Sequence, residues 1–272
     1  MIDIKKINDL REKIECRNLS IGSWIQLQDP NSAEIMAHAG FDWIAIDMEH
    51  GCISNHELPN LCRALELGDT VPLVRIFSAN ERDVRTALEA GAAGLIVPRV
   101  ESAAQIKQVL SWSQWPPKGQ RGVGFSRANL YGGQFTNYKD FAQSPIIIPM
   151  IESQEGVTNL HDILNTDGIN TIFVGPYDLS ASLGITGKLE NPIYAETLDK
   201  IKKTCRSMNK GYGIHVVSPE KDALRDAINE GYTFIAFSID ATFLRHSSKN
   251  PLKEETSDIT EQNQKKSDRK KS

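Results

Sequence analysis

The chain is predicted to fold as a single-domain α/β protein of the (β/α)8 TIM barrel class. Apolar, β-branched runs alternate with helical segments eight times along about 230 residues, which is the period and count of this barrel. Several runs are apolar at nearly every position, as expected for strands buried on both faces of a parallel sheet. No G-x-G-x-x-G motif opens a first helix, which disfavours an open dinucleotide-binding sheet.

The first half of the barrel is expected to follow a charged leading segment. Residues 1–17 predict a short amino-terminal helix, and the barrel itself is expected over 18–249. A helix is expected from Asn31 or Ser32 to His38, where Gly40 ends it. The remaining elements of this half are expected as strands over 19–26, 41–47, 71–75 and 91–98 and helices over 55–67, 80–90 and 102–112.

The alternation pauses over residues 113–144. This segment contains Pro116-Pro117 and Gly132-Gly133, and neither a strand nor a helix is predicted in it. A loop of this length in a compact domain is usually functional or disordered.

The second half resumes with apolar runs that begin at Ile146 and Thr171, separated by a crossover helix over 156–164. The elements expected after them are a helix over 192–208, a strand over 212–216, a helix over 219–230, a strand over 233–238 and a helix from about 240. Residues 250–272 lack apolar periodicity and are expected to form a charged, disordered tail.

The composition excludes several classes of partner. A net charge of −4 gives no general attraction to nucleic acid or to anionic membranes. The amino terminus has no long apolar segment typical of a signal peptide, and no run reaches the length of a membrane span. The four cysteines form no C-x-x-C pair, which fits reduced thiols. We therefore expect a cytoplasmic protein with a small-molecule partner.

Two carboxylates follow neighbouring strands of the predicted barrel. The run from Ile146 stops at Glu152, and the run from Thr171 leads to Asp178. The carboxyl ends of parallel strands meet at the edge where ligands and metals bind. The pair could therefore hold a hard divalent cation such as Mg²⁺ or Mn²⁺. The alternative is that Glu152 caps a helix and Asp178 starts one.

Further charged residues are expected at the same edge. His50 follows the second strand, Arg75 ends the third, and His215 lies on the seventh. A histidine near carboxylates suits proton transfer, and an arginine suits a carboxylate or a developing oxyanion. Taken alone, His50 could be a turn residue and Arg75 a structural ion pair. The combination across several strands favours a catalytic site.

These segments resemble the class II pyruvate aldolases of the HpcH/HpaI aldolase/citrate lyase superfamily. The resemblance covers roughly residues 18–246, and its motifs fall in order at the predicted strand ends. The matching segments are Asp29-Pro30, Ala33-Glu34, Gly40-Phe41-Asp42-Trp43, Asp47-Met48-Glu49-His50, Val74-Arg75, Pro116-Pro117-Lys118-Gly119-Gln120-Arg121-Gly122, Ile151-Glu152-Ser153-Gln154-Glu155-Gly156 and Gly175-Pro176-Tyr177-Asp178-Leu179-Ser180-Ala181-Ser182-Leu183-Gly184.

The resemblance implies a metal-dependent carbon–carbon lyase that cleaves or forms a 4-hydroxy-2-oxo acid through a pyruvate enolate. Glu152 and Asp178 match the ligands of a divalent metal, Mg²⁺ or Mn²⁺, with Co²⁺ as a further candidate. Arg75 matches the residue that stabilises the enolate. His50 matches the acid/base, and Glu89 falls where the family has a carboxylate that pairs with this histidine. Homo-oligomers, commonly hexamers, are also implied.

Three positions depart from the best-known members. Met150 replaces a common Gln, Tyr177 replaces a small residue, and His215 replaces an apolar one. Tyr177 and His215 are expected to contact substrate together with Arg75 and Asp178, so the identity of the aldehyde stays open. Two other functions also stay open, namely a citrate-lyase β type enzyme acting on an acyl-CoA and a non-catalytic barrel that binds a keto acid.

Overall fold

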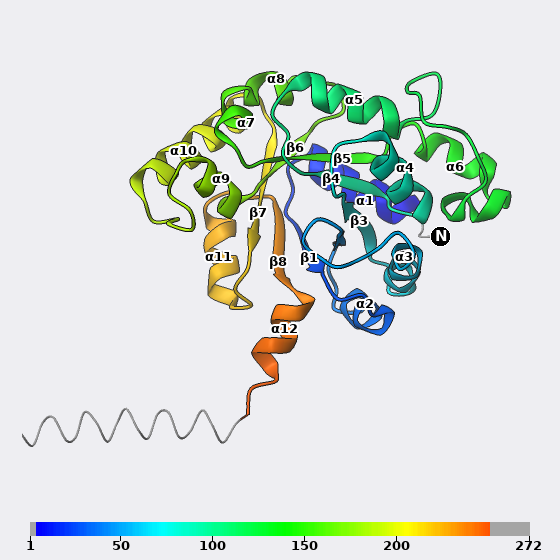
Figure 1. The fold of residues 1–272 in the computed structure, drawn as a ribbon, viewed down its shortest axis with the longest axis horizontal. Coiled ribbons are helices and arrows are strands. Elements are labelled where there is room, and N and C mark those ends of the chain that lie inside the picture. Colours follow the sequence, from blue (N-terminus) through cyan, green and yellow to red (C-terminus); the bar gives the residue numbers. More distant parts are fainter. Residues whose placement is uncertain (1–3, 251–272) are drawn as a thin grey trace, which may run out of the picture.

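The computed structural model describes residues 4–250, in which eight parallel strands pair in sequential order and close into one barrel (Figure 1). The strands are β1 (Ser20–Ile25), β2 (Trp43–Asp47), β3 (Val71–Arg75), β4 (Gly94–Val97), β5 (Ile146–Ile151), β6 (Thr171–Val174), β7 (Gly211–Val216) and β8 (Phe234–Ile239). This arrangement confirms the (β/α)8 barrel that the alternation of apolar and helical segments predicted.

Helices surround the strands (Figure 1). They are α1 (Ile4–Glu15), α2 (Pro30–Ala37), α3 (Leu58–Leu67), α4 (Glu81–Ala90), α5 (Ala103–Ser113), α7 (Gln154–Thr158), α8 (Leu160–Leu164), α9 (Pro176–Ser182), α10 (Pro192–Ser207), α11 (Lys221–Asn229) and α12 (Asp240–Ser247). Local capping explains several starts, since the side chains of Asp29, Asn80 and Ser102 each accept a hydrogen bond from a backbone N–H of the first turn that follows. Asp29 thus caps α2, where Asn31 or Ser32 was predicted to do so.

The interior of the barrel is filled by large side chains. The rings of Trp43 and Phe234 stack with centroids 4.2 Å apart, and the Trp43 Nε1–H donates to the Ser20 hydroxyl at 2.9 Å. A Cβ on Gly22 of β1 would lie only 2.1 Å from the Trp43 ring, so the indole can lie here only because this position is a glycine. The barrel is therefore a packed core rather than a pore.

The amino-terminal end of the barrel is closed by helices. Ile7, Leu10 and Ile14 of α1 are buried in the same apolar cluster as the barrel interior. The segment 113–144, predicted without structure, contains a 3-10 helix, η1 (Arg127–Gly132), and a further α-helix, α6 (Phe135–Phe141). Tyr138 and Phe141 of α6 join that cluster. The long segment is thus an ordered cover for the end of the barrel opposite the predicted site.

The segment between β5 and β6 also differs in detail from the prediction. The expected crossover helix consists of two short helices, α7 and α8. Ser153, rather than Glu152, caps α7, because its hydroxyl accepts from the Gly156 N–H. Asp178 lies in the first turn of α9, a helix that was considered only as an alternative.

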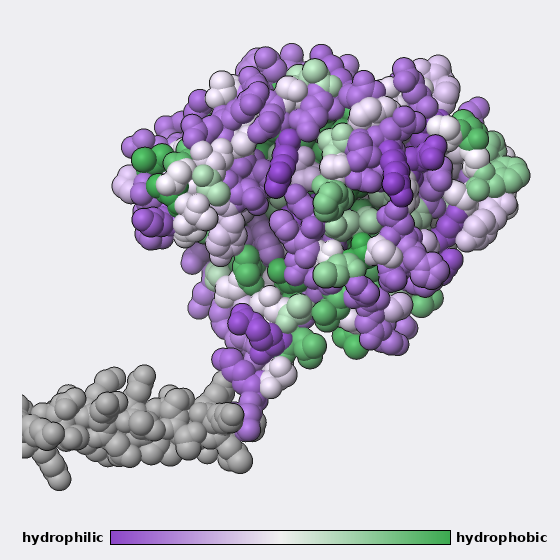
Figure 2. All heavy atoms as spheres, viewed as in Figure 1, coloured by the Kyte–Doolittle hydropathy of each residue, from purple (hydrophilic) through white to green (hydrophobic). Residues whose placement is uncertain are grey.

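The face of the molecule seen in Figure 2 is mostly polar. Hydrophilic side chains cover most of the face shown in Figure 2, with apolar residues in small separate groups. Within residues 4–250, no helix combines the length and apolar character that a membrane span requires. The tail predicted over 250–272 falls, apart from its first residue, outside the described residues.

Candidate functional site

The carboxyl ends of the strands surround a pocket of about 300 Å³. Five of the predicted catalytic, metal-binding and substrate-binding residues line it, namely His50, Arg75, Tyr177, Asp178 and His215. The rest of its wall is formed by Trp24, Gln26, Asp47, Met150, Phe173, Val174, Gly175, Pro176, Val217 and Ile239. The barrel brings these residues together because parallel strands deliver their carboxyl ends to one edge.

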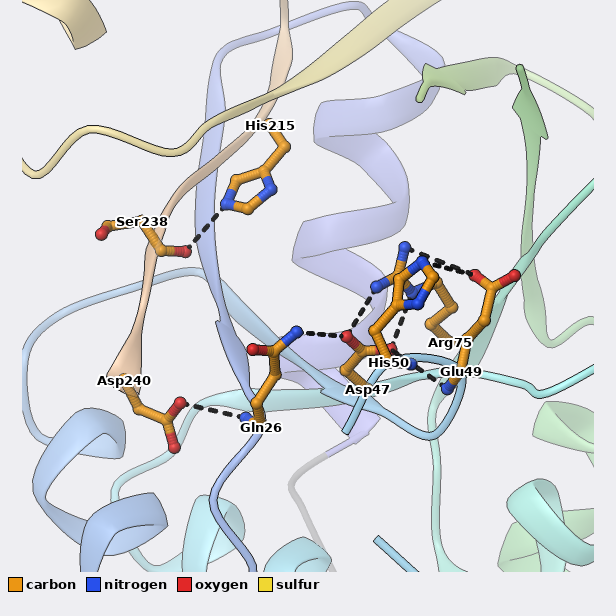
Figure 3. A network of polar contacts seen from close by, with 8 residues as sticks. All are labelled: Gln26, Asp47, Glu49, His50, Arg75, His215, Ser238 and Asp240. Atoms are coloured by element: carbon orange, nitrogen blue, oxygen red, sulfur yellow. Dashed lines mark hydrogen bonds and ion pairs between the residues drawn. The ribbon is translucent and has the colours of Figure 1, made fainter. Parts of the chain in front are cut away.

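Arg75 is held in one orientation by Asp47 (Figure 3). The two residues lie opposite each other in the register of β2 and β3. Arg75 Nε donates to Asp47 Oδ1 at 2.8 Å and Nη2 donates to Oδ2 at 2.6 Å, while the guanidinium lies 4.6 Å from the centroid of the Trp24 ring. Burial alone would raise the pKa of Asp47, but hydrogen bonds from Arg75 and Gln26 and the charge of Arg75 lower it below its usual value.

Asp47 also shapes the turn that carries His50. Its Oδ1 accepts from the backbone N–H groups of Glu49 and His50, both at 3.1 Å. Glu49 Oε2 then lies 3.4 Å from Arg75 Nη1 and 3.8 Å from His50 Nε2. Burial raises the pKa of Glu49, opposed by the charge of Arg75. The His50 side chain is 53% exposed, so it lies at the rim of the pocket with Glu49 as its neighbouring carboxylate.

Glu152 lies directly after β5 and is only 4% exposed. Its Oε1 accepts from the Arg99 N–H at 2.6 Å. Burial, with a smaller contribution from the negative charges of Glu49 and Asp178, raises the pKa of this carboxyl to about 7, although the hydrogen bond from the Arg99 N–H opposes the change. A Cβ on Gly175 would lie 2.4 Å from Glu152 Oε2, so Glu152 occupies space that this glycine leaves open.

The carboxylates fit a hard divalent cation. Glu152 is buried near two other acidic groups, Glu49 and Asp178, which is unfavourable for a charged carboxylate unless a cation compensates it. Among the described residues, no group of three His, Cys, Asp or Glu side chains is arranged as a complete metal site. The chain would thus supply Glu152 and Asp178, and oxygens of substrate and water would complete the coordination that Mg²⁺ and Mn²⁺ prefer.

His215 lies on β7, in the wall of the pocket away from His50. Its Nε2 is 3.2 Å from the backbone oxygen of Ser238 on β8, and its ring centroid is 5.9 Å from that of Trp24. Burial lowers the pKa of His215 to about 4, so the imidazole is neutral in the folded protein near pH 7.

Two residues that were not singled out in the sequence, Gln26 and Asp240, help to hold Asp47, the partner of Arg75, in place. Asp240, the first residue of α12, accepts from the backbone N–H groups of Gln26 and Leu27 at 3.0 and 3.1 Å. The Gln26 side chain in turn donates to Asp47 Oδ2 at 2.8 Å. The available signal in the sequence was that a polar residue directly follows the strand in both cases, Gln26 after β1 and Asp240 after β8. It marks a position at the barrel edge but does not identify the partner.

Glu89 and Tyr177 lie in different surroundings. Tyr177 is 56% exposed and forms part of the pocket rim. Glu89 lies eight residues beyond the first residue of α4, about 12 Å along a helix that runs back toward the other end of the barrel. There it borders a separate depression with His56 and Arg63 and raises the pKa of Tyr138, itself raised mainly by burial. The structure does not bring Glu89 to His50 within one chain.

Several known proteins are similar to this chain in sequence or in fold. The sequence model of the HpcH/HpaI aldolase/citrate lyase family matches residues 20–247. A hydroxypyruvate/pyruvate aldolase of Roseobacter denitrificans is 30% identical over 246 residues, which are 90% of this chain and 95% of the relative. A 2-keto-3-deoxy-L-rhamnonate aldolase of Escherichia coli is 31% identical over 86% of this chain and 87% of its own. The crystal structure of a protein of this family from Burkholderia cenocepacia has a TM-score of 0.85 at 30% identity, covering 91% of this chain and 98% of that one.

Proposed function

Because the chain belongs to the HpcH/HpaI aldolase/citrate lyase family and is a carbon–carbon lyase, we propose that it interconverts a 4-hydroxy-2-oxo acid with pyruvate and an aldehyde. The observation that carries this proposal is the placement of one fixed guanidinium, Arg75, at the same barrel edge as the carboxylates Glu152 and Asp178. An oxo acid has a carboxylate and a keto oxygen, and Arg75 together with a cation held by Glu152 and Asp178 would offer positive charge to both.

Glu152 and Asp178 are proposed to hold a divalent metal, Mg²⁺ or Mn²⁺, with Co²⁺ as a further candidate. Such an ion supplies Lewis acidity toward the keto oxygen of the oxo acid. Glu152 is proposed to ligate it as a carboxylate, since a bound cation compensates the burial and the neighbouring negative charge that raise its pKa. Asp178, in the first turn of α9 and in the pocket wall, is placed to ligate the same ion.

Arg75 is proposed to stabilise the enolate that remains on the pyruvate part when the carbon–carbon bond breaks. Asp47 accepts hydrogen bonds from Nε and from one N–H of Nη2, and these bonds fix the plane of the guanidinium before substrate binds. The second N–H of Nη2, and Nη1, which also lies 3.4 Å from Glu49 Oε2, are proposed to face the developing oxyanion. Donors fixed in advance stabilise such charge without a cost of reorganisation at the moment of reaction.

His50 is proposed to move the proton of the C4 hydroxyl. In the cleavage direction it accepts this proton as the bond between C3 and C4 breaks, the aldehyde forms, and the bonding electrons pass into the enolate. Its position at the rim, 3.8 Å from Glu49, lets a substrate hydroxyl reach the ring from the pocket. Within one chain Glu49, and not Glu89, is the carboxylate near His50. A role for Glu89 would need a second copy of the chain, which the predicted homo-oligomer would supply.

The two competing functions make different demands on the pocket. An acyl-CoA lyase of the citrate-lyase β type needs basic side chains for the CoA phosphates, yet Arg75 is the only Lys or Arg in the wall of the pocket and is paired with Asp47. A barrel that only binds a keto acid has no use for His50 at the rim.

A pyruvate-release assay with 4-hydroxy-2-oxo acids, run with and without EDTA, tests the proposal. Release that EDTA abolishes and Mg²⁺ or Mn²⁺ restores is the expected result. Activity on an acyl-CoA thioester alone, or binding of pyruvate without any turnover, would replace the proposal with one of the alternatives.

A further inference from the structure

The hydrogen bond of His215 fixes which of its ring nitrogens carries the proton. The partner of Nε2 is the backbone oxygen of Ser238, 3.2 Å away, and a carbonyl oxygen can only accept. Nε2 is therefore protonated, and in the neutral ring Nδ1 carries a lone pair. Burial, which lowers the pKa of His215 to about 4, keeps the ring in this neutral form.

The lone pair of Nδ1 is directed into the pocket. Figure 3 shows this nitrogen on the side of the ring away from Ser238, toward the part of the barrel mouth that holds Arg75 and His50. Within residues 4–250 no hydrogen-bond donor is placed against it, although His215 lines the pocket. Around it the wall is mostly apolar, with Trp24, Phe173, Val217 and Ile239.

The position of His215 separates it from the reacting bond. Arg75 and His50 are close to one another through Glu49, and the proposed chemistry takes place there. The Trp24 ring lies near both the Arg75 guanidinium and the imidazole of His215, so His215 adjoins this part of the pocket wall. If the pyruvate part is held by Arg75 and by a cation at Glu152 and Asp178, as proposed above, the side of the pocket with Trp24 and His215 is left for the part that becomes the aldehyde.

We propose that His215 accepts, at Nδ1, a hydrogen bond from a hydroxyl group on the aldehyde-derived part of the substrate, so that the preferred aldehyde is a hydroxyaldehyde. This inference rests on the aldol function proposed above. An acceptor in an otherwise apolar wall favours a substrate that can donate to it, because an aldehyde without a hydroxyl displaces water from Nδ1 and offers it no donor in return.

The experiment compares two aldehydes that differ by one hydroxyl. Aldol addition of pyruvate is measured with glycolaldehyde and with acetaldehyde, and the ratio of the two kcat/KM values is compared between the parent enzyme and His215→Leu. The parent ratio should exceed the ratio of the variant by about two- to tenfold, the usual worth of one neutral hydrogen bond. Comparing ratios removes the intrinsic difference in reactivity between the aldehydes.

Two further variants serve as a control and as a conservative replacement. His161→Leu makes the same change at an exposed histidine of α8 that does not line the pocket, and it should leave the ratio as in the parent. His215→Asn places an amide oxygen near the position of Nδ1 and should retain part of the preference that His215→Leu loses. If the leucine variant does not fold, the asparagine variant and the parent carry the comparison.

Proton exchange into the pyruvate methyl group in D₂O separates this inference from the proposed function, because it needs no aldehyde. The inference is supported if proton exchange persists in His215→Leu while the ratio of kcat/KM for glycolaldehyde to that for acetaldehyde falls below the parent value. Exchange with an unchanged ratio overturns the inference and leaves the aldolase function in place. Absence of both exchange and addition in the parent enzyme overturns the two together.

Discussion

Asp47 and Arg75 face each other at the ends of adjacent strands, and their two hydrogen bonds, 2.8 and 2.6 Å long, set the plane of the guanidinium. The carboxylate does more than neutralise a charge, because it also accepts from the N–H groups of Glu49 and His50. One side chain thus sets the positions of both residues proposed to act on the two halves of the substrate.

The planar fork of Arg75 gives the first prediction. Arg75→Lys keeps the charge but cannot form both hydrogen bonds to Asp47 in one plane. The rate of proton exchange into pyruvate in D₂O should fall by about a hundredfold or more, as when an oxyanion donor is lost. Arg63→Lys, at an exposed position on α3, is the control and should exchange normally. An unchanged rate in Arg75→Lys would exclude a role in stabilising the enolate.

The second prediction concerns the metal. Glu152→Ala and Asp178→Ala should each abolish both activity and the binding of Mn²⁺ followed by calorimetry, since one remaining carboxylate cannot hold the ion. Glu155→Ala removes an exposed carboxylate three residues after Glu152 and should bind the ion as the parent does. Full activity of either site variant in metal-stripped buffer would refute the assignment.

The third prediction separates two steps of the reaction. His50→Ala should lower the rate of cleavage by roughly a hundred- to ten-thousandfold, the usual contribution of a positioned acid or base. Proton exchange into pyruvate should survive better, because Arg75 and the carboxylates stay in place. His56→Ala, an exposed histidine beside a different depression, serves as the control. If cleavage and exchange fall by the same factor, His50 binds pyruvate or holds the structure instead.

The fourth prediction is a change of stability with pH. Burial lowers the pKa of His215 from an ordinary 6.5 to about 4, so the folded protein takes up its proton later than the unfolded chain does. The resulting stabilisation is complete above pH 6.5 and is lost as the pH falls from there toward 4. Urea unfolding over this range should show a steeper loss of free energy for the parent than for His215→Leu. Parallel curves would contradict the shift.

The fifth prediction tests the support behind the site. Asp240→Ala leaves the backbone N–H groups of Gln26 and Leu27 without their acceptor, which should lower the free energy of unfolding by about 1–3 kcal/mol. The exposed carboxylate of Asp222 offers the matched control, and Asp222→Ala should stay close to the parent in urea. A neutral Asp240→Ala would mean that water replaces the carboxylate at this turn.

Regular parts of this fold were predictable from the sequence, and the cover at the amino-terminal end was not. The strands were predictable because apolar residues dominate most of them, as in β5 and β6. The helix α6 was missed although Phe135, Tyr138 and Phe141 recur at helical spacing, because it has only seven residues and directly follows a segment with Gly132 and Gly133. Its stability depends on packing against α1, more than a hundred residues away in the chain, which no local pattern records.

The candidate site shows the same division. His50, Arg75, Asp178 and His215 could be grouped in advance, because each follows or ends a strand and parallel strands share one edge. Glu89 was placed by resemblance alone, and the direction of α4 carries it away from His50 within one chain. Hydrogen bonds between the two ends of the chain, such as that from the Gln26 N–H to Asp240, depend on how the last helix packs against the first strand. Sequence spacing does not contain that information.

The space left by Gly175 offers a way to sort related sequences. Any side chain at this position would displace the carboxylate of Glu152, since even a methyl group would sit 2.4 Å from Oε2. A relative that keeps both acidic residues but carries alanine or a larger residue here should be unable to bind the cation as proposed. The residue at this single position therefore separates related sequences that can bind the cation in this way from those that cannot, before any protein is purified.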